Sequence, residues 1–300
     1  MPERASAVTV GTFDGVHLGH REILRRVRST AAAKEFRPVV VTFRPHPLAV
    51  VNPSAAPMLL TPDDEQLEAL QADGPLDVVI LEFTPELARH TADEFVREIL
   101  IDRFHVAELV IGYDHGLGRG RQGDAAALQR LGDELGFAVE IVPAALDAAG
   151  APISSSGIRT SVAHGDLERA KAALGRPYAF AGTVVEGEQR GRALGYPTIN
   201  IALRSPRKLL PPDGVYAVRA RTTRGVFGGM MNLGGRPTFG DLERTLEVHL
   251  FDVSGDWYGE RVSVDFVRRL RDTIRFESVD RLVVQLDEDA KNARFALTQA

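Results

Sequence analysis

The sequence predicts an α/β protein of two domains, a doubly wound parallel sheet followed by an antiparallel β-barrel with a C-terminal helix. In the first half, short apolar runs without polar alternation are separated by helical patterns, which is typical of a parallel sheet covered on both faces. In the second half, short strand-like segments follow one another with Gly, Pro and Asp turns between them. A chain of 300 residues is also long enough for two hydrophobic cores.

Five apolar runs in the first half are expected to be strands, and the four helical patterns between them are expected to cover the sheet. Ligands of such sheets bind beyond the carboxyl ends of the strands. We therefore expect Gly11–Gly15, Arg44–Pro47 and Gly112–Gly118, which each follow a strand, to converge on one crevice. The expected strands and helices are Val8–Val10, Leu18–Ala33, Val39–Phe43, Asp63–Ala72, Val78–Leu81, Ala92–Phe104, Leu109–Ile111, Ala125–Leu135 and Val139–Val142.

A change of pattern near residue 178 marks the expected domain boundary, with domains of residues 1–178 and 179–300. Before it, a helical pattern covers Ser161–Leu174 with a break at Gly165. After it, the first long helical pattern is Val279–Leu297. The expected strands of the second half are Val184-Val185, Val215–Ala220, Val226–Met231, Leu246–Phe251 and Val262–Phe266.

Composition excludes several classes of protein. The net charge of −5 gives no general electrostatic case for binding nucleic acid. The chain has no cysteine, which excludes disulfides and thiolate chemistry. The N-terminus lacks the apolar core of a signal peptide, and no apolar run is long enough to span a bilayer. We therefore expect a cytoplasmic protein without nucleic-acid or membrane partners, and its assembly into a homo-oligomer stays open.

The segment from Val8 to His20 is the strongest candidate for a functional site. It combines an apolar strand, a glycine turn and the start of a helix that carries His17 and His20. Backbone N–H groups at a helix start have no helical partner and attract anions, and the two imidazoles add hydrogen-bond donors. This pattern suits a polyphosphate, and it would stabilise charge on phosphorus without a covalent step. The alternative is a structural turn with surface histidines.

The ten residues Gly11–His20, Gly-Thr-Phe-Asp-Gly-Val-His-Leu-Gly-His, resemble the nucleotidyltransferase superfamily and are similar to the bacterial bifunctional riboflavin kinase/FAD synthetases. The resemblance implies that the first domain is an FMN adenylyltransferase, in which an FMN phosphate oxygen attacks the α-phosphorus of ATP. It also implies Mg²⁺ as a cofactor. By the same resemblance His17 and His20 are catalytic, and the nucleotide is bound by Gly11, Phe13, Asp14 and Gly19.

A second phosphate-binding candidate is Ile153–Arg159, Ile-Ser-Ser-Ser-Gly-Ile-Arg, which precedes a helix expected from Thr160. Hydroxyl groups and free N–H groups at a helix start, with a nearby guanidinium, suit a phosphate chain. The alternative is a serine N-cap with a surface arginine. The segment resembles the one that closes the nucleotide site in FAD synthetases, which implies triphosphate contacts for Ser155, Ser156 and Arg159.

The segment Thr42–Pro47 looks like the Phe-x-Pro-His-Pro loop of the same family, which lies near the flavin. The resemblance implies flavin contacts for Pro45, His46 and Pro47. The alternative is a proline-rich turn with a solvated histidine, because a turn alone carries no chemistry.

The segment Ile111–Gly118 aligns with the family's loop after the fourth strand. In it, Asp114 is expected to contact the nucleotide or a metal, or to cap the loop. Gly116-Leu117 stands where the family pattern has an arginine and a phenylalanine, so no flavin stacking is assigned there.

The second domain contains a further phosphate-binding candidate at Gly187–Asn200, Gly-Glu-Gln-Arg-Gly-Arg-Ala-Leu-Gly-Tyr-Pro-Thr-Ile-Asn. Glycines allow close approach of the backbone, arginines attract phosphates, and hydroxyl and amide oxygens suit a metal. The segment is not a Walker A loop, and it resembles the riboflavin kinase signature with Ile199 in place of alanine. The resemblance implies that Thr198 and Asn200 bind Mg²⁺ and that the nucleotide is bound by Gly191, Arg192 and Gly195.

The strand Leu246–Phe251 has an alternating pattern, which places Glu247 and His249 on one face and apolar residues on the other. In the family the glutamate at this position is the catalytic base, which implies that Glu247 accepts the proton of the ribityl hydroxyl. The alternative is a surface carboxylate. The segment Asn232–Phe239 also resembles a kinase loop, Asn-x-Gly-x-Arg-Pro-Thr-Phe.

Arg271 lies in another segment that resembles the family, although Thr273 stands there in place of a glutamate. The resemblance implies that Arg271 contacts the flavin or the nucleotide. The alternative is a solvated charge.

Together these motifs cover nearly the whole chain, and the resemblance implies a bifunctional enzyme. A nucleotidyltransferase domain and a riboflavin kinase domain would convert riboflavin to FMN and FMN to FAD, with ATP and Mg²⁺. One alternative is a monofunctional member whose other site is eroded, as the departures at Gly116, Leu117, Ile199 and Thr273 would favour. Others are a different nucleotidyltransferase, a fragment of an aminoacyl-tRNA synthetase, or a non-catalytic flavin-binding protein.

Overall fold

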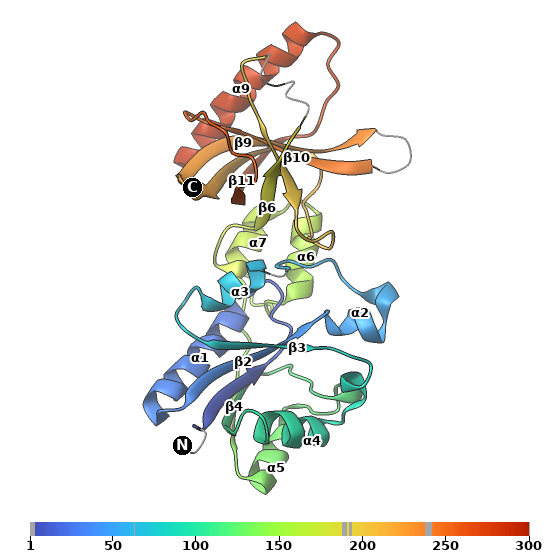
Figure 1. Ribbon diagram of the computed structural model, residues 1–300, viewed down its shortest axis with the longest axis vertical. Helices are drawn as coiled ribbons and strands as arrows, with labels where there is room; N and C mark the ends of the chain where they lie inside the picture. Colours follow the sequence, from blue (N-terminus) through green and yellow to red (C-terminus); the bar gives the residue numbers. More distant parts are fainter. Residues whose placement is uncertain (1–3, 63, 188–190, 192–193, 238–241, 300) are drawn as a thin grey trace. The chain divides into compact units, whose positions relative to one another are not determined.

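Figure 1 shows the computed structural model, which describes residues 4–62, 64–187, 191, 194–237 and 242–299. The chain divides into two compact units, residues 1–155 and 156–300. This division falls before residue 178 because the helix over Leu167–Leu174 (α7) packs against a strand of the second unit. The domain limits at residue 178 stay a prediction.

The first unit is built on a five-stranded parallel sheet, in which every expected strand of this half is present. Its strands are Ser6–Val10 (β1), Arg37–Arg44 (β2), Asp77–Glu82 (β3), Val106–Gly112 (β4) and Ala138–Val142 (β5). They pair in the order β3-β2-β1-β4-β5, all parallel. The parallel pairing predicted from uninterrupted apolar runs is therefore confirmed.

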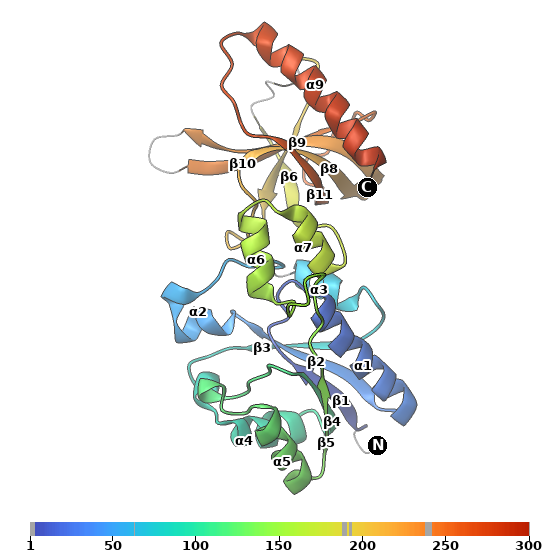
Figure 2. The ribbon, with the colours of Figure 1, turned by 180° about the vertical axis from the view of Figure 1, so that it is seen from behind.

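Helices cover both faces of this sheet, as Figure 2 shows. They are Leu18–Lys34 (α1), Pro47–Val51 (α2), Asp64–Gln71 (α3), Ala92–Phe95 (α4) and Ala125–Leu135 (α5), with short 3₁₀ turns at Pro53–Ala55, Leu87–Arg89 and Arg119–Arg121. Val40 packs with side chains of α1 and α3, whereas Val39 and Val41 pack with those of α4 and α5. All three valines are fully buried, so the inner strand is apolar on both faces and the doubly wound arrangement is confirmed.

Two elements of the first unit differ from the expectation. The helix expected over Ala92–Phe104 is wrong beyond α4, because the chain continues as a π-helix over Val96–Ile101 and then ends. Apolar spacing does not distinguish this wider turn from an α-helix. The short helix α2 was not expected, yet Pro47 suits a first helical turn and His46 caps it.

The second unit is a closed antiparallel barrel with a long C-terminal helix, as predicted. The strands are Ala179–Val185 (β6), Ile199–Leu203 (β7), Gly214–Thr222 (β8), Gly225–Pro237 (β9), Leu242–Leu250 (β10) and Arg261–Arg271 (β11). They close in the order β10-β7-β6-β11-β8-β9 with antiparallel pairing throughout. The strand β7 was missing from the expected strands because its apolar run is short and follows the glycine-rich segment.

Two helices precede the barrel. Ser155–Ala163 (α6) begins at Ser155, so the expected start at Thr160 is wrong. Serine and glycine are unfavourable in the interior of a helix, so the sequence placed the start too late. Both residue types are common at the beginning of a helix. The expected break at Gly165 is confirmed, because its φ is 76° and Asp166 accepts the N–H of Arg169 as the N-cap of α7.

The C-terminal helix Val279–Thr298 (α9) packs on the outside of the barrel, as Figure 2 shows. Its buried Ala293 and Ala296 contact apolar side chains of β8, β9 and β11. Inside the barrel, β10 contributes Leu246, Val248 and Leu250, all nearly inaccessible to solvent. The predicted packing of α9 and the predicted apolar face of β10 are thus confirmed.

Candidate functional site

Three loops leave the parallel sheet at one edge, where β1, β2 and β4 end as neighbours. The Gly11 N–H donates to the Val41 carbonyl at 3.0 Å, and the Thr42 hydroxyl donates to the Thr12 carbonyl at 3.3 Å. On the other side, the Tyr113 N–H donates to the Val142 carbonyl at 3.0 Å. The loops after β1 and β2 therefore meet at the carboxyl edge of the sheet, and the convergence of all three loops on one crevice stays a prediction.

The loop between β1 and α1 has a strained backbone. Phe13 and Val16 have φ values of 46° and 40°, a region that side chains with a Cβ rarely adopt, and both are buried. The Asp14 carboxylate holds the loop by accepting the N–H groups of Leu60 and Thr61, each at 2.9 Å. Strain of about 1–3 kcal/mol per residue persists only when the surroundings impose it, as they do at functional sites. The nucleotide contact expected for Asp14 stays a prediction.

The two histidines lie together at the start of α1. His17 is the N-cap, and its Nδ1 accepts the N–H of His20 at 3.4 Å. A neutral ring that accepts at Nδ1 carries its proton on Nε2, where it is a donor. The two rings stack with centroids 3.7 Å apart, and Phe13 contacts His20 edge-on at 5.2 Å. The first turn of α1 contains no acidic residue, and Leu18 and Gly19 lie between the two histidines. The site therefore combines a helix N-terminus with fixed imidazoles, which suits an anion.

The serine segment begins α6. The Ser155 hydroxyl donates to the Asp14 backbone carbonyl at 2.7 Å, which ties the start of α6 to the loop before α1. The Ser156 carbonyl accepts the Thr160 hydroxyl at 3.2 Å within the helix. Ser155 and Ser156 thus stand at a helix N-terminus, with Arg159 one turn further on. Their triphosphate contacts stay a prediction.

The proline segment forms the start of α2. His46 is half-buried, and its Nδ1 accepts the Leu48 N–H at 3.2 Å. This contact caps the turn and leaves the alternative of a proline-rich turn with a solvated His46 open. Pro45 follows a cis peptide bond and Pro47 is the first residue of α2. The flavin contacts expected for these three residues stay a prediction.

The loop after β4 contains a residue that the sequence did not single out. The exposed Asp114 has its carbonyl bonded to Arg121 at 2.6 Å, and the next residue, His115, is half-buried. Among the described residues the His115 Nε2 has no hydrogen-bond partner. Burial lowers the pKa of His115 to about 4, and the positive charge of Arg121 acts in the same direction. The sequence gave no sign that His115 matters, because no local pattern indicates that its ring is shielded from solvent.

Acid is expected to weaken the folded protein through His115. Since its pKa is about 4 in the folded state and about 6.5 when unfolded, the unfolded chain binds more protons between these values. Stability present at neutral pH is therefore lost as pH falls through this window, by about 2–3 kcal/mol. Urea unfolding at neutral and acid pH should show a smaller loss in His115→Phe than in the wild type. Equal losses in both proteins would contradict this.

The second site is built on the outer face of the barrel. Glu247 of β10 lies opposite Asn200 of β7 and opposite Asn232 of β9 in the strand register. Residues directly opposite in an antiparallel pair share a face, so the carboxylate has an amide side chain on each side. Since Leu246 and Val248 point inward, the face predicted for Glu247 is confirmed. Asn232 was not a candidate site residue, although it begins one of the quoted kinase-like segments.

The segment Gly187–Asn200 packs closely against its own end. A Cβ added to Gly187 would lie 2.0 Å from the Asn200 amide nitrogen, so any other residue at this position would displace that side chain. The Gly191 carbonyl accepts the N–H of Tyr196 at 2.9 Å, and Gly195 has a φ of 83°. Arg192 and residues 238–239 of the segment Asn232–Phe239 lie outside the described residues. The nucleotide contacts of this loop stay a prediction.

Oxygen donors near Glu247 fit a hard divalent cation. Asn200 offers an amide oxygen and Glu247 a carboxylate on adjacent strands, and Thr198, just before β7, offers a hydroxyl. In the described part of the chain there is no cluster of three or more His, Cys, Asp or Glu that could hold a metal. Mg²⁺ usually keeps several waters and is held by few protein oxygens together with substrate phosphates, so this donor set is compatible with it.

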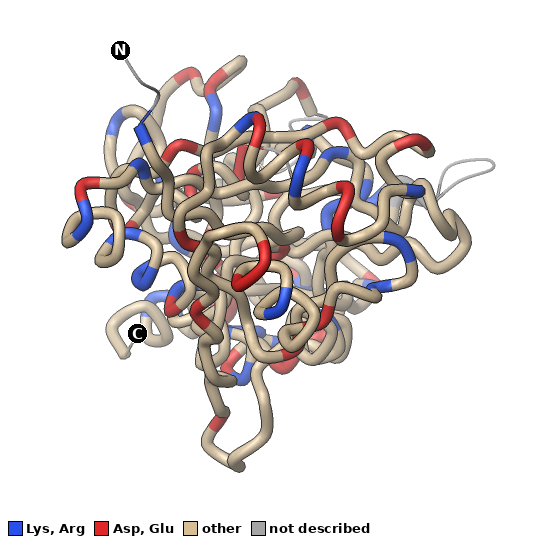
Figure 3. Tube along the Cα trace, turned by 90° about the horizontal axis from the view of Figure 1, so that it is seen from below, with Lys and Arg blue, Asp and Glu red and all other residues tan. Residues whose placement is uncertain are grey.

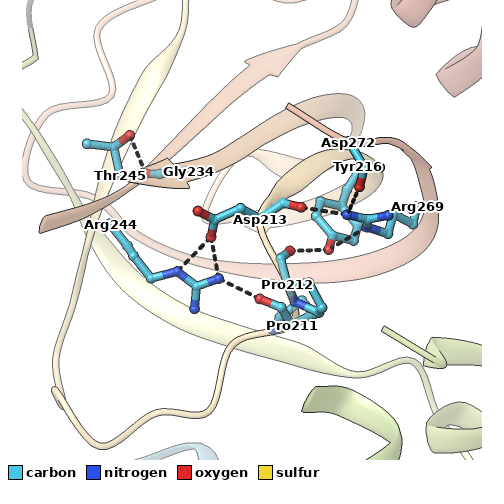
Figure 4. Close-up of polar contacts among 9 residues, drawn as sticks. All are labelled: Pro211, Pro212, Asp213, Tyr216, Gly234, Arg244, Thr245, Arg269 and Asp272. Atoms are coloured by element: carbon cyan, nitrogen blue, oxygen red, sulfur yellow. Dashed lines mark hydrogen bonds and ion pairs between the residues drawn. The ribbon is translucent and has the colours of Figure 1, made fainter. Parts of the chain in front are cut away.

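A polar network fixes β10 beside the neighbouring strands, as Figure 4 shows. Arg244 donates to the Asp213 carboxylate from Nε at 2.9 Å and from Nη2 at 2.5 Å. Arg269 of β11 donates to the Asp213 carbonyl at 2.6 Å and to the Tyr216 hydroxyl at 3.3 Å. Burial raises the pKa of Tyr216, so its hydroxyl stays a neutral hydrogen-bonding group. Arg244 lies three residues before Glu247 on β10, so this network holds the strand that carries Glu247.

Arg271 is paired rather than solvated. Its guanidinium donates to both carboxylate oxygens of Asp289 in α9, from Nε at 2.8 Å and from Nη2 at 2.6 Å. Asp289 is only 2% exposed, and Gln285 also donates to it at 3.1 Å. The alternative of a solvated charge is therefore wrong, and the flavin contact stays a prediction. No spacing in the sequence connected Asp289 with Arg271.

Replacing Arg271 by methionine is expected to lower the free energy of unfolding by about 3 kcal/mol, because the buried Asp289 carboxylate loses its counter-charge. Urea unfolding of the variant measures the loss. The double variant Arg271→Met, Asp289→Leu should recover part of it, since two apolar side chains replace the pair. A single variant as stable as the wild type would contradict the buried pair.

Family models match both halves of the chain. One described as FAD synthetase matches residues 1–157, and one described as Riboflavin kinase matches residues 174–297. The bifunctional riboflavin kinase/FMN adenylyltransferase of Haemophilus influenzae is 39% identical, over 96% of this chain and 93% of its own length. The protein of the same description from Bacillus subtilis is 32% identical, over 96% of this chain and 91% of its own.

A solved structure also matches nearly the full length. The crystal structure of a protein described as a macrolide-efflux protein from Streptococcus pneumoniae has a TM-score of 0.87 and 34% identity, and the match covers 98% of this chain and 95% of that one. In the present chain, none of the described helices has the length and apolar character that crossing a membrane requires.

The fold and the comparisons define a class: a nucleotidyltransferase-like α/β unit followed by a closed-barrel kinase unit. Both halves occur in the same order in the matched relatives. The chain belongs to the bifunctional riboflavin kinase/FMN adenylyltransferase family.

Proposed function

We propose that this chain is a bifunctional enzyme that phosphorylates riboflavin to FMN and adenylylates FMN to FAD, with ATP as co-substrate of both reactions. The observation that carries the proposal is the match of both halves, over nearly the full length, to relatives of that description. A synthetase fragment or another type of nucleotidyltransferase would not include the kinase half.

Adenylylation is assigned to the edge of the parallel sheet. The attacking FMN phosphate is already anionic, so the reaction needs positioning and charge neutralisation more than a strong base. The N-terminus of α1 offers N–H groups, and a neutral His17 offers Nε2–H, to the oxygens on the α-phosphorus as pyrophosphate leaves. His20, stacked on His17, is positioned to share this role.

Phosphorylation of riboflavin is assigned to the face of β10. Glu247 accepts the proton of the ribityl 5′-hydroxyl as that oxygen attacks the γ-phosphorus of ATP, and ADP leaves. Asn200 and Asn232 flank the carboxylate and orient it or the substrate by hydrogen bonds. Mg²⁺, held through Thr198 and Asn200, would neutralise charge on the phosphates when bound.

The monofunctional alternative loses support at two of its positions. Ile199 pairs with Val248, so it shares the apolar face of the strands and leaves the Glu247 face unchanged. At Gly116 the space of a side chain is taken by Arg121, because an added Cβ would lie 2.7 Å from the Cβ of Arg121. Ile199 therefore leaves the proposed kinase site unchanged, and the side chain of Arg121 occupies the space beside Gly116.

The proposed setting is the cytoplasm, with small-molecule substrates and without nucleic-acid or membrane partners. In Figure 3 basic and acidic residues are interspersed along the trace, in keeping with the small net charge of −5. A single-sign surface of the kind that attracts nucleic acid is not expected from this distribution.

The test is a time course with purified protein, riboflavin, ATP and Mg²⁺, in which the flavins are separated by chromatography. FMN followed by FAD is the expected result. FMN alone would mean that the adenylylation site is not functional, and FAD only from supplied FMN would place the defect in the barrel. No conversion of either flavin would overturn the proposal.

A further inference from the structure

The segment that leads from the glycine-rich loop into β7 is held from two sides. From β10, the Nδ1 atom of His249 lies 2.8 Å from the Pro197 carbonyl. From α9, Asp287 accepts the hydroxyl of Tyr196. Thr198 follows directly, before β7 begins at Ile199, so strand pairing does not position Thr198 itself. These two contacts fix the backbone on which the proposed metal ligand stands.

The contact of His249 determines the state of its ring. A carbonyl oxygen only accepts hydrogen bonds, so Nδ1 carries the proton and donates it to Pro197. The ring is further fixed by edge contacts, with Tyr196 at 5.1 Å and with Phe251 at 5.6 Å between centroids. His249 stands two residues after Glu247 on the same face of β10. One strand therefore carries the proposed base and the group that holds the opposite segment.

The contact of Tyr196 brings the C-terminal helix into the site. Its ring packs in the cluster between barrel and α9 that includes Leu286 and Ala290. Burial, together with the Asp287 hydrogen bond, raises the pKa of Tyr196 to about 12, so the hydroxyl remains a donor at physiological pH. The Tyr196 N–H in turn donates to Gly191, which links the same residue to the glycine-rich loop.

We propose that His249 and Asp287 are positioning residues of the kinase site, which hold Tyr196 and Pro197 and thereby place Thr198 and Asn200 beside Glu247. This inference rests on the proposed kinase function of the barrel. Helix α9 then contributes to the geometry of the kinase site through Asp287, in addition to packing on the outer face of the barrel. Neighbours that orient a metal ligand commonly change metal affinity or activity by about 10–100-fold when removed.

The test uses three substitutions of His249 that differ in whether, and where, the side chain offers an N–H donor. Asparagine keeps an N–H donor near the place of Nδ1, glutamine moves it outward, and alanine removes it. We expect His249→Ala and His249→Gln to lower riboflavin phosphorylation by about 10–100-fold, chiefly through a weaker response to Mg²⁺ and ATP. His249→Asn should recover most of this loss. In the same unit, His164→Ala is the matched control, since His164 is exposed and bonds only within its own helix turn.

Two measurements separate positioning from a general loss of structure. Hydrogen exchange at the amides of Tyr196 and of residues 198 to 200 should become faster in the alanine and glutamine variants than in the wild type, and should stay at the wild-type rate with asparagine. FAD formation from supplied FMN should stay at the wild-type rate in all three. Tyr196→Phe and Asp287→Ala should each lower the kinase rate by about tenfold, because the first removes the donor and the second the acceptor of the same hydrogen bond.

The outcomes are distinguishable. If the asparagine variant is as impaired as the glutamine variant, or exchange at residues 196–200 does not change in any variant, the positioning role is wrong. If Asp287→Ala has wild-type kinase activity, α9 takes no part in the site. If the wild type itself does not phosphorylate riboflavin while exchange changes as expected, His249 and Asp287 do hold the segment of Tyr196 and Pro197, but the proposed function of the barrel is wrong.

Discussion

Replacement of Glu247 by glutamine is expected to abolish FMN formation from riboflavin. Glutamine keeps the shape of the side chain but cannot accept the hydroxyl proton, and loss of a general base lowers a rate by about 10²–10⁴-fold. The neighbours Asn200 and Asn232 can still hydrogen-bond the amide, so the strand pairing should persist. The measurement is the initial rate of FMN formation at saturating riboflavin and ATP.

The control lies in the other unit of the same protein. FAD formation from supplied FMN should proceed in Glu247→Gln as in the wild type, because the proposed adenylylation site contains no residue of the barrel. If the variant makes FMN at the wild-type rate, Glu247 is a surface carboxylate and the proposed mechanism fails. If a folded Glu247→Gln loses both activities, the two-site model is wrong.

Replacement of His20 by alanine is expected to have the reverse effect. It removes an imidazole from the anion site at the start of α1, where a lost donor to developing charge costs about 10²–10³-fold in rate. FAD formation from FMN should fall by this factor, and FMN formation from riboflavin should continue. Chromatography would then show FMN accumulating in a reaction that begins with riboflavin.

A second substitution separates chemistry from packing, because His20 also stacks on His17 and contacts Phe13. His20→Phe keeps an aromatic ring in this stack but removes both nitrogen atoms. It should lose adenylylation as alanine does while unfolding at a temperature close to that of the wild type. A phenylalanine variant with full FAD formation would show that only the stacking matters.

Much of the fold was predictable because its signals are local. The run from Val39 to Val41 is apolar on both faces, which indicated an inner parallel strand before any partner was known. Alternation in β10 likewise gave the face of Glu247. The π-helix after Phe95 and the early start of α6 at Ser155 were missed, because apolar spacing and average propensities do not define the type or first residue of a helix.

The site was predictable only where one segment carries it. His17 and His20 lie in one short motif, and the structure places them in contact. The partners that hold site residues come from distant parts of the chain, as Asp289 does for Arg271 and Asp287 does for Tyr196. Such pairs depend on where α9 packs, and no local pattern in the sequence contains that information.

The pairing of Glu247 with Asn200 is also the seam at which the barrel closes. In the described residues β10 meets β7 through two residue pairs, whereas β10 meets β9 through nine. A short ladder at a closure is the first to open when a structure loosens. The proposed kinase site thus lies on the shortest strand pairing among the described residues of the barrel. Phosphorylation of riboflavin should therefore fail at denaturant concentrations that leave the rest of the barrel folded.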